Sequence, residues 1–361
     1  MKTYFNFFYS TALDYLNHYE KATGFSSLLM KVEHLELFNF KQFVLTNEIL
    51  NRVFALIRSS PENLINTEKK EELEKILIFL FNESLLYFVI GKEKNPIHHN
   101  IQTVENILQI VIDEKESYDF IRKAVILALL HDIGNGFVKP NLKKIKSSDI
   151  SDRKNELNNQ KLSKDEIDEE LKQLIDHAKE YRMAHMIEGS IIAEKLINQL
   201  NNAKELNITI EKNEINEIKK IILIHDIPSI AEYYSSIDKV ISTKDLIPLD
   251  NRLAVILREA DRLWMVSKEG LEKDLFDDLK KNKNPNPLEK LKHNYNRFKD
   301  EYKLYVNSNC SKEELYGFKN ETLFRTDAGF NLLTQYMSNR INEILSYDYD
   351  INIMNQLKNK N

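Results

Sequence analysis

Five separated positions in the chain place an imidazole or a carboxylate at or near the end of an apolar segment with helical spacing. They are His99, the adjacent pair His131 and Asp132, His185, His225 and Asp261. Imidazole and carboxylate side chains are the ligands that suit Mn, Fe, Co, Ni and Zn, and a bundle of helices can bring them together at one point. The sequence therefore predicts a metal centre built from residues that lie far apart in the chain.

The number of these side chains favours two metal ions over one. A single ion with open coordination positions needs roughly three or four protein ligands, and the chain offers more than that. We therefore expect a binuclear centre of two divalent transition metal ions (Mn, Fe, Co, Ni or Zn) with one bridging carboxylate. Asp132 is the natural bridge, because its neighbour His131 leaves the same helix about 100° away. At the first position His98 competes with His99, and we prefer His99.

The segments that must position these residues have the apolar period of helices. Helical spacing runs from residue 3 to about 94, with a break near Ser59 and Ser60, where Ser60 would cap a helix that begins at Pro61. Further helices are expected over 101–111, 121–130, 183–200, 215–224 and 251–266, followed by a C-terminal helical region from about 287 to 346. The stretch 206–210 is expected to be a short strand or a loop.

Composition supports an all-α fold. The chain of 361 residues has only 8 Gly and 7 Pro, too few turn-forming residues for a many-stranded sandwich or barrel. We expect a helical N-terminal region at 1–95, a central domain at 96–280 and a helical C-terminal region at 281–361. Within the central domain, residues 139–182 are so rich in charge that they predict a solvated helical insert near the mouth of the site.

Charge, cysteine content and hydropathy exclude several classes of function. Lys and Arg total 51 against 56 Asp and Glu, a net charge of -5, so nucleic acid is disfavoured as the main partner. Cys310 is the only cysteine, which excludes an intrachain disulfide and favours a reducing compartment. The N-terminus lacks the apolar core of a signal peptide, and the most apolar stretch, 76–90, is too short to span a membrane. We expect a cytoplasmic protein without a membrane segment.

Several of these segments together resemble a known family. The stretch 128–135, ALLHDIGN, resembles the hallmark of the HD superfamily of metal-dependent phosphohydrolases, which combines an early His, an adjacent His-Asp pair and a distal Asp. The stretch 99–104 is similar to the first element of that pattern and 257–263 to the last. His185 and His225 are similar to the additional histidines of the binuclear members. A His-Asp dipeptide recurs by chance, whereas the ordered combination is specific.

The resemblance implies an HD-domain helical bundle with helical extensions at both ends. It implies that one metal is held by His99, His131, Asp132 and Asp261, and the second by Asp132, His185 and His225. Asp132 would be the central catalytic residue, and a metal-activated hydroxide would attack a phosphate ester of a small substrate, expected to be a nucleotide or cyclic nucleotide. The cations near the motifs that would bind phosphate oxygens are Lys139, Arg182, Arg258 and Arg262.

Two departures from the family pattern keep other functions open. Asn135 stands where a Lys often follows the His-Asp signature, and Asp226 stands where the cyclic-dinucleotide branch has a second His, which disfavours cyclic di-GMP as substrate. The same ligand set is similar to that of the HD-fold di-iron oxygenases. A third alternative is a catalytically silent module that senses a ligand or docks a partner. A homo-oligomer is also left open.

Overall fold

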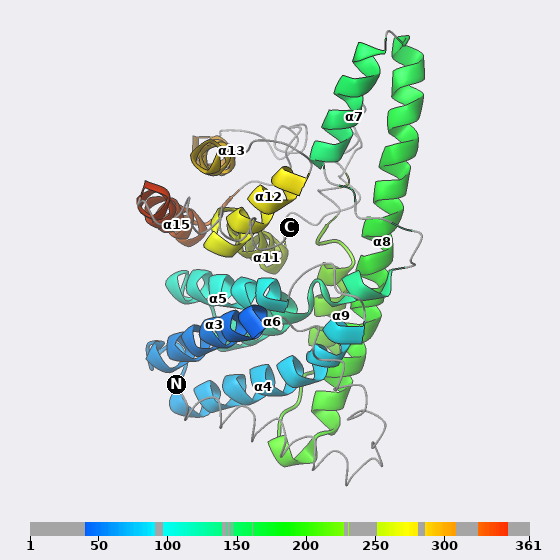
Figure 1. Cartoon of the computed structure of the whole chain (residues 1–361). Helices are drawn as coiled ribbons and strands as arrows, with labels where there is room; N and C mark the ends of the chain where they lie inside the picture. The colour runs from blue at the N-terminus through cyan, green and yellow to red at the C-terminus, as the bar shows by residue number, and fades with distance from the viewer. Residues whose placement is uncertain are drawn as a thin grey trace.

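The computed structural model describes residues 40–90, 97–138, 142, 145, 147–160, 162–226, 230, 251–280, 286–307 and 324–345. Within these residues the secondary structure consists of helices and their connections, with no strand (Figure 1). The predicted all-α fold is confirmed. The expected domain boundaries near 95 and 280 fall beside or within stretches outside the described residues, and no described helix is long and apolar enough to cross a membrane.

The described residues form eleven α-helices and three 3₁₀ turns. The helices are α3 (Phe40–Ser59), α4 (Thr67–Ile90), α5 (Ile97–Asp113), α6 (Tyr118–Leu130), α7 (Ser147–Asn159), α8 (Lys164–Asn202), α9 (Lys212–Ile222), α11 (Arg252–Arg262), α12 (Lys268–Lys280), α13 (Pro287–Asn307) and α15 (Asp327–Leu345). Short 3₁₀ turns occur at η2 (Ile133–Phe137), η3 (Lys204–Leu206) and η5 (Leu263–Val266). Most of the expected helices are therefore present, with shifted ends.

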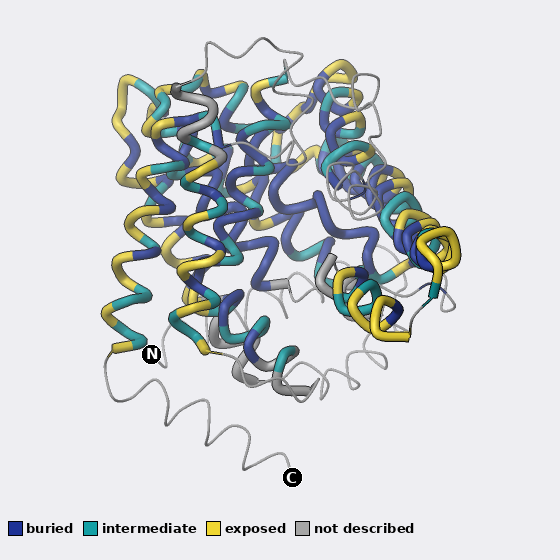
Figure 2. Tube along the Cα trace, turned by 90° about the horizontal axis from the view of Figure 1, so that it is seen from above, coloured by how far each residue is buried: buried dark blue, intermediate teal, exposed yellow. Residues whose placement is uncertain are grey.

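The central element of the bundle is α6. Its N-terminus is capped by Ser117, whose side chain accepts a hydrogen bond from the backbone N–H of Phe120. Most of its residues are apolar and buried, and α4, α5, α9 and α11 pack around it. Figure 2 shows buried segments gathered in the interior of the bundle and exposed segments on its outer faces. Because α6 ends at Leu130, the polar residues that follow it lie inside the bundle, where they need partners.

The charged insert is a helical hairpin with a small core of its own. It consists of α7 and the first half of α8, which extend together beyond the other helices (Figure 1). Ile150, Leu157, Leu171 and Ile175 are fully buried between these two helices. The expected start of a new helix at residue 183 is wrong, because α8 runs without a break from Lys164 to Asn202. The insert is thus joined rigidly to the helix that carries His185.

One further expectation, about the start of a helix, needs correction. The second N-terminal helix begins at Thr67 and not at Pro61. The physical reason is the cap at Asn66, whose side chain accepts a hydrogen bond from the backbone N–H of Lys69 at 3.0 Å. Of the two alternatives for 206–210, the loop is present and the strand is not. The backbone of Ile210 bonds to the side chain of Asn201 and does not pair with another strand.

Candidate metal centre

Asp132 lies at the centre of the cluster of histidine and aspartate residues. Its Oδ2 atom is 3.6 Å from Nε2 of His99 and 3.9 Å from Nε2 of His131. Its Oδ1 atom is 3.6 Å from Nε2 of His185 and 3.3 Å from Nε2 of His225. The two oxygens of one buried carboxylate therefore face two different pairs of imidazoles.

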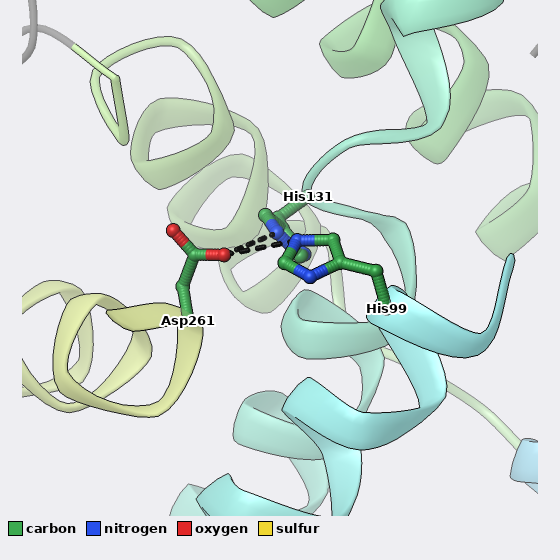
Figure 3. A group of neighbouring side chains, drawn as sticks. All are labelled: His99, His131 and Asp261. Atoms are coloured by element: carbon green, nitrogen blue, oxygen red, sulfur yellow. Dashed lines mark ion pairs between the residues drawn. The ribbon is translucent and has the colours of Figure 1, made fainter. Parts of the chain in front are cut away.

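The first group, which we call half-site one, is formed by His99, His131 and Asp261 (Figure 3). These residues come from the first turn of α5, the C-terminal end of α6 and the last turn of α11. Oδ1 of Asp261 lies 3.0 Å from Nε2 of His99 and 3.5 Å from Nε2 of His131. In Figure 3 both imidazole rings point toward the same carboxylate oxygen. The oxygen Oδ2 of Asp132 lies beside the same two nitrogens.

The second group, half-site two, is formed by Asp132, His185 and His225. His185 lies within α8, and His225 follows α9 by a single turn. Their Nε2 atoms are 3.4 Å apart. Asp226 adds a nearby carboxylate, with Oδ2 at 3.5 Å from Nε2 of His185, and it forms an ion pair with Arg182. Asp226 and Arg182 therefore add one negative and one positive side chain beside the three potential ligands of half-site two.

The geometry of both half-sites fits metal ions. Bonds of about 2.0–2.2 Å from a central ion would place neighbouring ligand atoms about 3.0–3.5 Å apart. Most of the separations between ligand atoms in the two half-sites are close to this range and longer than a good hydrogen bond. Nδ1 of His131 bonds to the carbonyl of Ala128 at 2.8 Å, and Nδ1 of His225 to that of Ile222 at 2.7 Å. Each ring is thereby oriented with Nε2 toward the other side chains of the cluster, where it could bind a metal ion.

The pKa values of the buried histidines differ between the two half-sites. Burial disfavours the charged form of His131, but the carboxylates of Asp132 and Asp261 outweigh burial and raise the pKa of His131 to about 9. Burial also opposes ionisation of Asp261, yet hydrogen bonds with His131 and His99 hold the pKa of Asp261 well below its usual range. In half-site two, burial lowers the pKa of His185 to about 3, so this imidazole is neutral. A neutral imidazole is the form that binds metal, so an ion at half-site one would have to displace the proton of His131.

A close contact between backbones brings the two halves together. Gly134 in η2 lies against α8, where a Cβ atom added to it would be 2.0 Å from the carbonyl oxygen of His185 and 2.3 Å from the backbone nitrogen of Gly189. Only glycine permits this approach. The turn that carries His131 and Asp132 is therefore held directly against the helix that carries His185.

The side chains expected to bind substrate phosphate lie in different surroundings. Lys139 lies outside the described residues. Arg182 pairs with Asp226, and Nη1 of Arg258 donates to the backbone carbonyl of His225 at 3.4 Å. Arg262 is buried, with its guanidinium 5.3 Å from the centre of the Phe298 ring. Arg182 and Arg258 thus lie beside half-site two, whereas Arg262 is directed toward α13.

The structure also separates His99 from its neighbour. His99 belongs to half-site one, whereas the ring of His98 packs 5.3 Å from that of Trp264, and burial lowers the pKa of His98 to about 3. The Trp264 ring lies edge-on to His99 at 4.9 Å. The preference for His99 agrees with this placement. Trp264 covers one side of both imidazoles.

Sequence reasoning missed two asparagines on α5 that hold the helix ends carrying the ligands. Nδ2 of Asn100 donates to the carbonyl of Leu129, and Nδ2 of Asn106 donates to that of Ala260, both at 2.9 Å. Both asparagines are fully buried. The signal in the sequence was the place of these amide side chains beside the apolar positions of α5.

Comparison with known proteins adds no family assignment. No protein-family model matches the chain, and no curated protein or solved structure matches it either.

Proposed function

We propose that this protein is a metal-dependent phosphohydrolase of the HD type, which hydrolyses a phosphate ester of a small molecule, with a nucleotide as the expected substrate. The observation that carries the proposal is the position of Asp132, whose two oxygens face two separate groups of imidazoles. A carboxylate in this position suits a pair of ions held close together. Binuclear sites of this kind are typical of enzymes that act on phosphate esters.

The residues of the site would act in two ways: some would bind the ions, and others lie beside them. Asp132 would bind both ions, Asp261 would complete the first and the histidines would fill the remaining positions. When bound, two such ions lower the pKa of a water molecule and neutralise charge on a phosphoryl group. Arg182 already pairs with Asp226 and Arg258 already contacts a carbonyl. We therefore expect the ions to supply most of the positive charge that the phosphoryl group meets.

The alternative with the same ligand types is a di-iron oxygenase, and the test must distinguish the two. The full-length protein is loaded with Mn²⁺ under strictly anaerobic conditions and given nucleotides, phosphomonoesters and cyclic dinucleotides. Release of phosphate or nucleoside is then measured. We expect hydrolysis of at least one compound, undiminished by the absence of O₂, and a loss of more than about a hundredfold in Asp132→Asn.

Other results would select the alternatives. Consumption of O₂ by the iron-loaded protein, coupled to loss of a substrate and without anaerobic hydrolysis, would identify an oxygenase. A purified protein that binds no transition metal would contradict both activities and favour the silent module.

A further inference from the structure

The C-terminal helix α15 reaches the metal centre through a chain of buried hydrogen bonds. The hydroxyl of Tyr336 donates to Oδ1 of Asn106 at 2.6 Å, and Nδ2 of Asn106 donates to the carbonyl of Ala260 at 2.9 Å. Ala260 directly precedes Asp261 in the last turn of α11. Two hydrogen bonds therefore join α15 to the backbone that carries one ligand of half-site one.

Further hydrogen bonds from Gln102 and Arg52 fix the side chains around Tyr336 and Asn106. Nε2 of Gln102 donates to the hydroxyl of Tyr336 at 2.9 Å and to Oε2 of Glu105 at 2.8 Å. Glu105 in turn accepts two hydrogen bonds from Arg52 of α3, at 2.6 and 2.8 Å. Gln102, Glu105 and Asn106 are all buried, so each polar atom that loses its partner would remain away from water. The network has little freedom to rearrange.

A second connection joins α15 to the same turn of α11. The carboxylate of Glu259 accepts hydrogen bonds from the backbone N–H groups of Arg325 and Thr326 and from the hydroxyl of Thr326. Thr326 directly precedes α15, so Glu259 satisfies backbone donors that the start of this helix leaves unpaired. Three consecutive residues, 259, 260 and 261, thus hold the N-terminus of α15, accept the bond from Asn106 and supply a metal ligand.

We propose that Asn106 and Tyr336 are positioning residues for Asp261, and that α15 is for this reason a structural part of half-site one. The inference rests on the proposed metal centre. A carboxylate must be placed within a fraction of an ångström to bind an ion, and partners outside the ligand shell contribute strongly to metal affinity. Half-site two has no such connection to Asn106 or Tyr336 among the described residues. The effect of these residues is therefore confined to one of the two ions.

The test measures each half-site alone in the full-length protein. His225→Ala removes a ligand of half-site two and leaves half-site one to be titrated with Co²⁺, followed by its visible absorption. His99→Ala removes a ligand of half-site one and leaves half-site two to be titrated in the same way. In the His225→Ala background we expect Tyr336→Phe to raise the Kd for Co²⁺ about fivefold and Asn106→Ala to raise it roughly tenfold or more. In the His99→Ala background neither change alters the Kd.

The matched control is Tyr302→Phe. This change also removes a tyrosine hydroxyl bond to α15, the 2.5 Å bond to Asp327, but this bond is not part of the chain that runs through Asn106 to Ala260. We expect it to leave the Co²⁺ affinity of both half-sites unchanged.

Two results would overturn the positioning role while the metal centre stands: Tyr336→Phe and Asn106→Ala act equally on both half-sites, or they act on neither. Failure of both backgrounds to bind Co²⁺ would instead overturn the metal centre and this inference with it. Thermal unfolding of each metal-free variant checks that it is folded.

Discussion

At the scale of single residues, the decisive feature is a carboxylate shared between two groups of histidines. Asp132 is 8% exposed and has an imidazole nitrogen within 4 Å of each of its oxygens. A buried carboxylate is costly unless it is paired or binds metal. Asp132 is the residue on which both half-sites depend, whereas each histidine belongs to one of them.

The residue-scale prediction concerns the number of bound ions. We expect Asp132→Ala to lower bound metal from about two equivalents to near none, and His185→Ala or His225→Ala to lower it to about one. Inductively coupled plasma mass spectrometry of the purified variants measures the equivalents. Asp119→Ala, at the exposed opposite end of α6, is the control and should retain both ions. If His185→Ala and His225→Ala each kept two equivalents, the centre would not be binuclear in the way described.

At the scale of elements, the metal centre depends on how closely η2 approaches α8. The approach is possible because two glycines face each other across the contact, Gly134 in η2 and Gly189 in α8. The two positions differ in how much space a methyl group would find. A Cβ atom added to Gly134 would be 2.0 and 2.3 Å from rigid backbone atoms of α8. A Cβ atom added to Gly189 would be 3.3 Å from its nearest neighbour, a side-chain methyl of Ile222.

This difference predicts unequal effects of the same substitution. Gly134→Ala should force the turn away from α8, lower the free energy of unfolding by about 3 kcal/mol and weaken metal binding at half-site two. Gly189→Ala should cost less than about 1 kcal/mol, because the side chain of Ile222 can shift by a few tenths of an ångström and alanine favours the helix. Urea unfolding and metal titration measure both effects. Equal destabilisation by the two changes would contradict the argument from backbone contact.

At the scale of the whole molecule, the apolar core is divided between the bundle and the hairpin. One continuous cluster joins α3 through α6, the second half of α8, and the helices from α9 to α15. The hairpin of α7 and the first half of α8 has a separate cluster that includes Leu171 and Ile175. Because the two clusters are separate, the hairpin can lose stability without the bundle losing its own.

We therefore expect Leu171→Ala and Leu200→Ala to act on different parts of the protein. Both residues are fully buried in α8, and each change removes the same atoms, at a cost of about 2–5 kcal/mol to the core it belongs to. Leu171→Ala should speed hydrogen exchange in residues 147–178 and leave the metal content unchanged. Leu200→Ala should lower the unfolding temperature of the bundle. Exchange that rises across the whole chain in Leu171→Ala would show that hairpin and bundle unfold as one unit.

The sequence by itself determined the helical class and the set of candidate ligands. Helical periodicity is a local property, so the helix that carries Asp261 could be placed within a few residues. The polar residues after the apolar segment 121–130 were conspicuous because a buried helix end needs partners. The high charge of the insert was also visible, but not the continuity of α8, since the helix passes from solvent to core without a break.

Only the tertiary structure decided how these residues meet. The assignment of one oxygen of Asp132 to each half-site depends on side-chain orientation, which no spacing encodes. Arg182 and Arg262 looked equivalent as cations near a motif, yet one pairs with Asp226 and the other stacks on Phe298. The bond between Asn106 and Tyr336 joins residues 230 positions apart. Periodicity and capping act over a few residues, whereas such contacts depend on how whole helices pack, and this is why the sequence alone did not reveal them.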